Sequence, residues 1–180
     1  MNKTKKLATI GMLCAMSYIA VTVGRIPIVL FLKYNPKDIF ITIGGFIFGP
    51  ATAFCMSVMV SVLEMCTISS TGVIGCAMNI LSTCAFACTS SYVYQKRRNI
   101  SGALLGLFLG CVSMIAIMLL WNYLISPLYM GYPREKIAKL LLPAFLPFNL
   151  MKSGLNAAVT MLVYQPIVGS LRRLHFLDSV

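Results

Sequence analysis

Long apolar segments run along the whole chain, separated by short polar breaks or by breaks rich in proline and glycine. Segments of this length are typical of membrane helices, which need about 20 residues to cross a bilayer. They lack the strict apolar and polar alternation expected of strands in a membrane barrel. The sequence therefore predicts an all-α membrane protein, with six transmembrane helices in one bundle and a single domain over residues 1–180. The helices are expected at residues 7–23, 38–48, 51–66, 73–94, 102–125 and 142–171.

The breaks between these segments have recognisable chemistry. Asn35-Pro36-Lys37-Asp38 is typical of a helix start, because Asn35 can cap, Pro36 suits the first helical position and an acid suits the first turn. Gly49-Pro50 is expected to break the chain between the second and third helices. Residues 25–34 and residues 127–139 are expected to be connections without regular structure.

One apolar segment carries an unusual polar stripe. Asn149, Lys152 and Asn156 are spaced three and then four residues apart, which places them on one face of a helix. Lys152 is the only cation that lies clearly inside an apolar segment of this sequence. Because a charge inside a membrane is costly, such a residue indicates a functional site unless a structural partner explains it.

The composition agrees with a membrane protein. The chain is 59% hydrophobic and 11% charged, and its mean hydropathy is +0.88, whereas about a quarter of residues are charged in a soluble domain. The net charge of +11 does not indicate nucleic-acid binding, because the basic residues gather beside the ends of apolar segments. Anionic lipid is the partner that these clusters favour.

The basic residues also predict an orientation. With six helices, both termini lie on the same side, together with the break after the fourth helix. The positive-inside rule places that side in the cytoplasm. The basic residues on this side are Lys3, Lys5, Lys6, Lys96, Arg97, Arg98, Arg172 and Arg173.

In this orientation the polar residues of the apolar segments converge on the outer half of the bundle. They predict a ligand pocket that opens to the outside and has no polar path to the cytoplasm. Structural alternatives remain: Lys152 can extend to the headgroups, Glu64 can face the outer loop or pair with Lys152, and amides often join helices. The candidate ligand-binding residues are Asp38, Glu64, Asn79, Asn122, Asn149 and Lys152.

The chemistry of these residues favours a small polar ring compound as the ligand. Amides pair with a heterocycle edge that carries donors and acceptors, nearby aromatic rings stack on its face, and a carboxylate accepts from sugar-type hydroxyls. No catalytic motif or phosphate-binding loop is present, so we expect no enzyme. The seven cysteines form no CxxC pair, and we expect neither a metal site nor a cofactor.

The first helix carries two pairs of small residues, Gly11 with Ala15 and Ala20 with Gly24. Small residues four apart allow another helix backbone to approach closely. The sequence leaves two alternatives open, packing inside this protein and docking to another membrane subunit.

Two stretches resemble a known family. They are 36–39 running into 43–50, and Pro147-Phe148-Asn149-Leu150-Met151-Lys152 running to Tyr164-Gln165-Pro166; the entry of the fourth helix, from Thr71 to Asn79, is similar but less specific. Over essentially its whole length the chain resembles the substrate-binding S component of an energy-coupling factor (ECF) vitamin transporter. Among these components it is most similar to the riboflavin-specific ones.

This resemblance implies six helices, binding of riboflavin from outside, and a complex with a transmembrane coupling subunit and two ATPase subunits. It implies that Gly11 and Ala15 dock the coupling subunit, and that transport occurs by toppling of the S component in the membrane. It also implies riboflavin contacts from Asp38, Asn122, Asn149 and Lys152, while Asn79 and Glu64 are candidates by position alone. The alternatives are an S component for another vitamin or heterocycle, and a membrane scaffold without transport.

Overall fold

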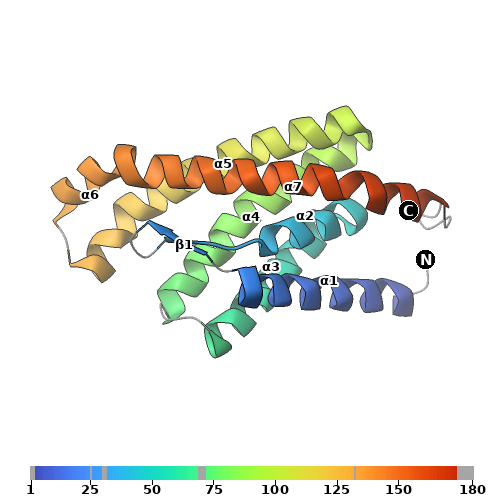
Figure 1. Ribbon diagram of the computed structural model, residues 1–180, viewed down its shortest axis with the longest axis horizontal. Helices are drawn as coiled ribbons and strands as arrows, with labels where there is room; N and C mark the ends of the chain where they lie inside the picture. Colours follow the sequence, from blue (N-terminus) through green and yellow to red (C-terminus); the bar gives the residue numbers. More distant parts are fainter. Residues whose placement is uncertain (1–2, 25, 30–31, 69–71, 132, 174–180) are drawn as a thin grey trace.

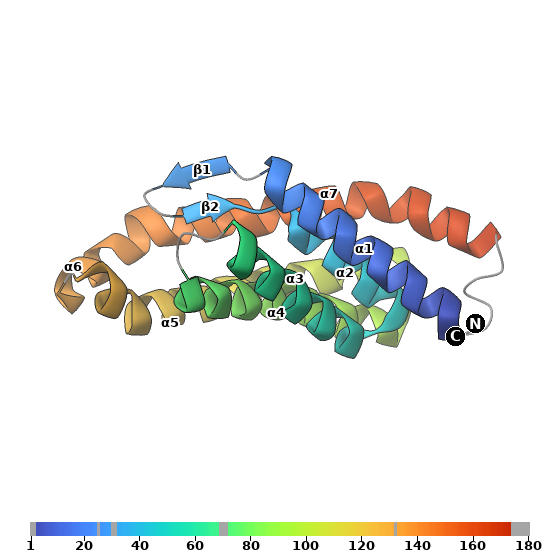
Figure 2. The same cartoon turned by 90° about the horizontal axis from the view of Figure 1, so that it is seen from below.

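The structure is a computed structural model that describes residues 3–24, 26–29, 32–68, 72–131 and 133–173. Its elongated helical bundle carries a two-stranded hairpin near one end (Figures 1 and 2). The elements are α1 (Lys3–Gly24), β1 (Ile26–Val29), β2 (Leu32–Tyr34), α2 (Lys37–Phe48), α3 (Pro50–Thr67), α4 (Gly72–Arg97), α5 (Ile100–Met130), α6 (Arg134–Leu140), a π-helical turn (Leu141–Phe145) and α7 (Leu146–Arg173).

The six predicted helices correspond to α1 to α5 and α7, but both predicted connections contain regular structure. Strands β1 and β2 pair antiparallel, with Ile26 opposite Tyr34. Within the second connection, α5 continues through Pro127 to Met130, and α6 runs through the π-helical turn directly into α7. The continuous helical backbone of α6, the π-helical turn and α7 therefore begins at Arg134, eight residues before the predicted residue 142 (142 − 134 = 8). These elements were missed because they are short, and sequence patterns detect long apolar helices best.

The start of α2 differs from the prediction in detail. The helix begins at Lys37, and Pro36 precedes it without a side-chain cap. The predicted cap Asn35 is buried, but its Oδ1 has no hydrogen-bond partner among the described residues. The first turn is instead anchored by the buried side chains of Lys37 and Asp38. The predicted break is confirmed: Gly49 has φ 103°, which favours glycine, and Pro50 opens α3.

Helices α4 and α5 approach closely through small residues. A Cβ atom at Gly106 would lie 2.6 Å from the backbone oxygen of Ser90, and one at Gly110 would lie 2.8 Å from that of Phe86. On one side of this contact, Phe86, Leu107 and Met114 belong to the largest buried apolar cluster. Glycine on α5 therefore sets the spacing of the two helices that frame the core.

Gly106→Ala is expected to destabilise the protein by about 1–3 kcal/mol, because the added methyl group forces α4 and α5 apart. Gly154→Ala is the matched control, since nothing lies within 4 Å of a Cβ atom there. In that open position alanine favours the helix by about 1 kcal/mol. Thermal unfolding in detergent measures the stability of both variants. Equal melting temperatures for Gly106→Ala and Gly154→Ala would contradict a tight contact between Gly106 and Ser90.

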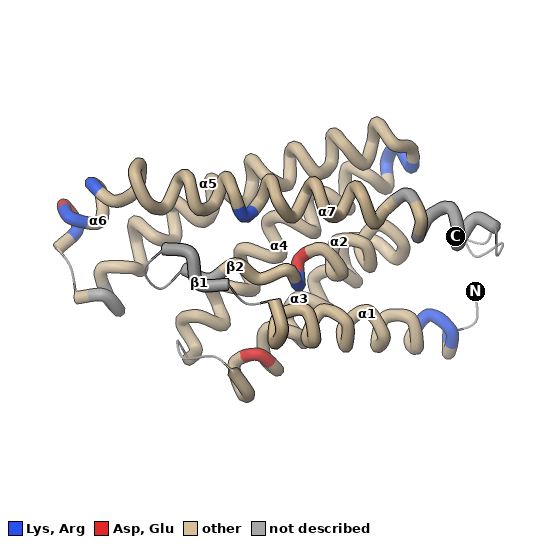
Figure 3. The backbone as a smooth tube through the Cα atoms, viewed as in Figure 1, with Lys and Arg blue, Asp and Glu red and all other residues tan. Residues whose placement is uncertain are grey.

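The two ends of the bundle differ in what they carry. The start of α1, the α4–α5 turn and the end of α7 lie at one end, and α6 lies at the other (Figure 1). Basic residues of α1 and of the α4–α5 turn gather at the first end, and those of α6 at the second (Figure 3). The side chains of Arg172 and Arg173 lie outside the described part. In the described residues, α1, α3, α4 and the Ile100–Pro127 part of α5 are long and apolar enough to cross a membrane.

Candidate functional site

Asp38 is the centre of a buried polar cluster that joins α2, α4 and α7. Its side chain is fully buried, and its Oδ2 lies 3.6 Å from Lys152 Nζ. Asn156 Nδ2 donates to the same oxygen at 2.9 Å, and Thr83 Oγ1 donates to Oδ1 at 2.7 Å. These four residues, Asp38, Thr83, Lys152 and Asn156, form the Asp38 cluster. The buried carboxylate is thus both paired and hydrogen-bonded, as a charge in the interior requires.

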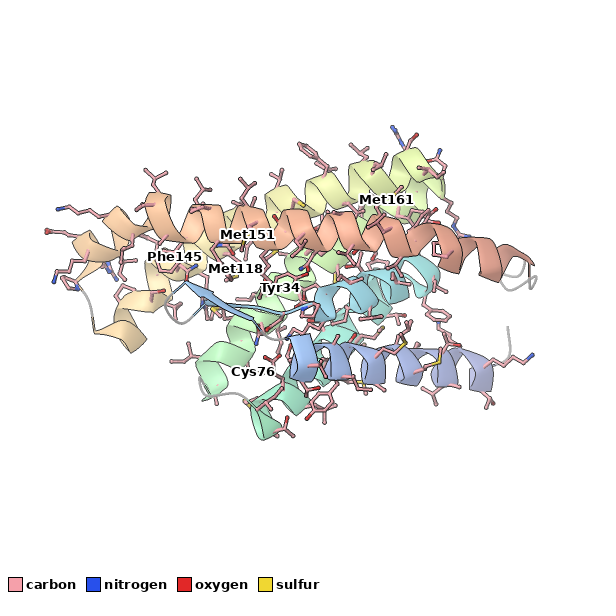
Figure 4. The ribbon with its side chains drawn as sticks, viewed as in Figure 1. Tyr34, Cys76, Met118, Phe145, Met151 and Met161 are labelled. Atoms are coloured by element: carbon pink, nitrogen blue, oxygen red, sulfur yellow. The ribbon has the colours of Figure 1, made fainter. Side chains whose placement is uncertain are left out.

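Two further residues complete the surroundings of the Asp38 cluster. Lys152 Nζ donates to Ser82 Oγ at 3.1 Å. Tyr34, the last residue of β2 (Figure 4), donates from its hydroxyl to Asn156 Oδ1 at 2.9 Å. Burial, together with the negative charge of Asp38, raises the pKa of Tyr34 to about 12. The Tyr34 hydroxyl therefore stays protonated at neutral pH and donates this hydrogen bond.

A second buried cluster joins α2, α3 and α4. Lys37 Nζ lies 2.6 Å from Glu64 Oε2 and donates to Ser61 Oγ at 3.2 Å. The other carboxylate oxygen, Glu64 Oε1, accepts from Asn79 Nδ2 at 3.3 Å. Lys37 and Glu64 are both fully buried. These four residues, Lys37, Ser61, Glu64 and Asn79, form the Glu64 cluster.

The pairing of charges corrects two expectations from the sequence. Lys152 is not the only cation in the interior, because Lys37 is buried as well. Glu64 pairs with Lys37, and Lys152 pairs with Asp38. The spacing around the Gly49-Pro50 break could have predicted the pairing of Lys37 with Glu64. Lys37 lies 12 residues before Gly49 (49 − 37 = 12), and Glu64 lies 14 residues after Pro50 (64 − 50 = 14). Residues at similar distances from a tight turn between two helices lie side by side.

Asn122 and Asn149 are buried too, but their contacts lie within their own helical segments. Asn122 Oδ1 accepts from Ser126 Oγ at 3.1 Å, and its Nδ2 has no hydrogen-bond partner among the described residues. Asn149 Nδ2 donates to the backbone oxygen of Phe145 (Figure 4) at 2.8 Å, across the end of the π-helical turn. An unsatisfied buried amide is costly, so Asn122 Nδ2 is a donor that a bound acceptor would satisfy.

The small residues of α1 divide into two roles. Gly11 and Ala15 are exposed, and nothing lies within 4 Å of a Cβ atom at Gly11. The buried residues Leu13, Cys14 and Ser17 lie on other faces of the helix. By contrast, a Cβ atom at Gly24 would lie 2.9 Å from the ring of Pro36. The Gly11–Ala15 pair therefore faces away from the bundle, and Gly24 packs inside it.

The described residues contain no group of three or more His, Cys, Asp or Glu side chains that could hold a metal ion. The seven cysteines are free thiols. The site consists of amides, hydroxyls and two ion pairs, which can hold a ligand by hydrogen bonds.

Comparison with known proteins identifies the family. Residues 5–164 match the model of the ECF transporter, substrate-specific component family. The chain belongs to this family. As a member, it is a substrate-specific component of a transporter and not an enzyme.

Two individual proteins are similar over nearly the full length. The riboflavin transporter RibU of Staphylococcus aureus (strain TCH60) is 25% identical over 183 residues, which cover 97% of this chain and 96% of that protein. A solved structure described as "Structure and mechanism of the S component of a bacterial ECF transporter" has a TM-score of 0.82 and 22% identity. The match covers 94% of this chain and 99% of the solved one, and it establishes that the two share a fold.

Proposed function

We propose that this S component captures riboflavin from outside the cell in a pocket formed by the outer half of the bundle. The observation that carries the proposal is the Asp38–Lys152 pair, buried in the interior of a membrane transporter component. Each charge neutralises the other, so the site suits an uncharged polar ligand better than an ion. Similarity to the S. aureus riboflavin transporter supports riboflavin as that ligand.

Each candidate residue has a role in this proposal. Asp38 accepts hydrogen bonds from the ribityl hydroxyls, and Lys152 donates to oxygen atoms of the ligand. Asn122 and Asn149 pair with the edge of the isoalloxazine ring, and Asn122 Nδ2 is a buried donor without a partner in the described structure. Asn79 and Glu64 belong to the polar interior beside these contacts, where Glu64 accepts a hydrogen bond from Asn79 at 3.3 Å.

The proposed orientation has six membrane-spanning helices, with both termini in the bacterial cytoplasm. It is supported by the basic residues that gather at the end where α1 begins (Figure 3). Helix α2 is short at 12 residues, but ten of them are buried, so its neighbours shield it from lipid. Helix α7 carries Asn149, Lys152 and Asn156 on a buried face.

The proposed transport cycle requires a transmembrane coupling subunit and two ATPase subunits, and proceeds by toppling of the whole component. A closure of packed aromatic side chains towards the cytoplasmic end supports this scheme. There the ring centroids of Phe46 and Tyr94 lie 4.4 Å apart, and the buried hydroxyls of Tyr94 and Tyr164 share a hydrogen bond of 3.0 Å. Ligand cannot leave through such a packed centre without repacking it, so a movement of the whole component is the simpler route.

A thermal-shift screen against a panel of vitamins tests the substrate. Riboflavin at about 100 times its Kd is expected to stabilise the protein by about 2.7 kcal/mol, since it binds only the folded state. The other vitamins are expected to leave the melting temperature unchanged. Stabilisation by a different vitamin alone would contradict riboflavin as the substrate, and no stabilisation by any of them would favour a scaffold.

Asn122→Ala is expected to weaken riboflavin binding about tenfold while changing the ligand-free stability by less than about 1 kcal/mol. The variant removes a buried donor that forms no bond without ligand, and in the ligand-free protein it loses only the hydrogen bond from Ser126. Asn156→Ala is the comparison, because it removes hydrogen bonds with Asp38 and Tyr34 and should cost about 2–3 kcal/mol of stability. Fluorescence titration and thermal unfolding separate the two effects. An unchanged Kd for Asn122→Ala would contradict its role as a ligand contact.

A further inference from the structure

We propose that Lys37 and Glu64 are a positioning pair, which holds the Asp38 carboxylate in place for the ligand without touching the ligand. The inference rests on the proposed function, because Asp38 is taken as a riboflavin contact. It assigns Lys37 a role, and it gives Glu64 a supporting role in place of the ligand contact expected from the sequence.

The contacts of the pair connect it to the ligand site through the first turn of α2. Lys37 is the first residue of that helix and Asp38 is the second. The Lys37 side chain reaches Glu64 and Ser61 on α3, and Glu64 in turn accepts from Asn79 on α4. Any shift of this turn along or around the helix axis would break the 2.6 Å contact between Lys37 and Glu64.

The backbone of the same turn is also held. Ser17 on α1 is fully buried and donates from its hydroxyl to the backbone oxygen of Lys37 at 3.4 Å. Thr42 Oγ1 donates to the backbone oxygen of Asp38 at 2.6 Å. Contacts to α1, α3 and α4 therefore fix the position of this turn, and they fix the position of Asp38 with it. Binding sites of this kind need their contact residues locked by such supporting groups.

The charges give the pair a second effect on Asp38. Among the described residues, the interior holds two cations, Lys37 and Lys152, and two carboxylates, Asp38 and Glu64. Lys37 interacts electrostatically with Asp38 as well as with Glu64. The Glu64 carboxylate balances the charge of Lys37, so Asp38 stays paired with Lys152 and available to the ligand. Without that charge, Lys37 would draw Asp38 away from its position beside Lys152.

The test compares Glu64→Gln with the double variant Lys37→Gln/Glu64→Gln in the purified full-length protein, with riboflavin as the probe. Glu64→Gln leaves Lys37 without its main counter-charge, and riboflavin binding is expected to weaken about tenfold or more. In the double variant the two amides are uncharged, Asp38 returns to Lys152, and the Kd is expected to recover to within about threefold of the wild-type value. Glu135→Gln, on exposed α6, is the matched control and should have no effect.

Fluorescence titration gives the Kd and the binding-competent fraction separately, and the absorption spectrum of bound riboflavin reports its surroundings. The spectrum is expected to shift in Glu64→Gln and to recover in the double variant. If Glu64→Gln lowers only the competent fraction, the pair merely stabilises the fold; if the double variant does not recover, Glu64 contacts the ligand. Either result would overturn the positioning role while wild-type binding upholds the proposed function. A wild-type protein that binds no riboflavin would overturn both.

Discussion

Replacing Lys152 with methionine is expected to weaken riboflavin binding by about 100-fold and to destabilise the ligand-free protein by about 3 kcal/mol. The stability effect follows because Asp38 would remain buried without its cation, which is the costly way to break a buried ion pair. The binding effect follows because the ligand loses a charged donor. Methionine is unbranched and matches the lysine side chain except for its terminal ammonium, so its packing in α7 changes little. Fluorescence titration and thermal unfolding of the same preparation measure the two quantities.

The double variant Asp38→Asn/Lys152→Met separates these two effects. With no uncompensated charge left in the interior, its stability is expected to return towards the wild-type value. Riboflavin binding should remain weak, because both proposed ligand contacts have lost their charge. If Lys152→Met is destabilised yet binds riboflavin with an unchanged Kd, the pair joins helices and does not contact the ligand.

A leucine at Gly11 is expected to abolish riboflavin uptake by cells while leaving riboflavin binding by the purified protein unchanged. Gly11 is exposed, and nothing lies within 4 Å of a Cβ atom there, so the larger side chain fits the isolated fold. On the outward face of α1 it would prevent the close approach of a coupling-subunit helix. Cellular uptake of labelled riboflavin, with fluorescence titration of the purified variant, measures transport and binding separately.

Gly154→Leu is the matched control for this prediction. Gly154 is also exposed and open, but it lies on α7, away from the proposed docking face. Its uptake and binding are both expected to match the wild type. Normal uptake by Gly11→Leu would place the docking surface elsewhere, whereas a loss of binding would show that Gly11 supports the fold itself.

The sequence was a good guide to the helices and a poor guide to their short connections. Length and hydropathy predict α1, α3, α4 and α5 because each is a long apolar segment. The Gly49-Pro50 break is equally local, since glycine there adopts φ 103°. The β1–β2 hairpin and α6 were missed because both are short and their segments show neither long apolar runs nor clear alternation.

The polar residues were predicted to face inward, and they do, but their pairing could not be predicted. Helical spacing places Lys152 and Asn156 on one face of α7, and both reach Asp38. The pairing of cations with carboxylates depends on how each helix is rotated about its axis and crosses its neighbours. This geometry is determined by close packing, such as that of Gly106 against Ser90, and hydropathy does not encode it. For this reason the burial of Lys37 was missed.

The measurement that tests the account most directly is a riboflavin titration of the purified wild-type protein, followed by its own fluorescence and by the absorption spectrum. The account predicts saturable binding of one riboflavin per chain, a changed flavin spectrum, and loss of both in the Lys152→Met variant at the same ligand concentration. A wild-type protein that leaves the riboflavin spectrum and fluorescence unchanged across the titration would contradict it.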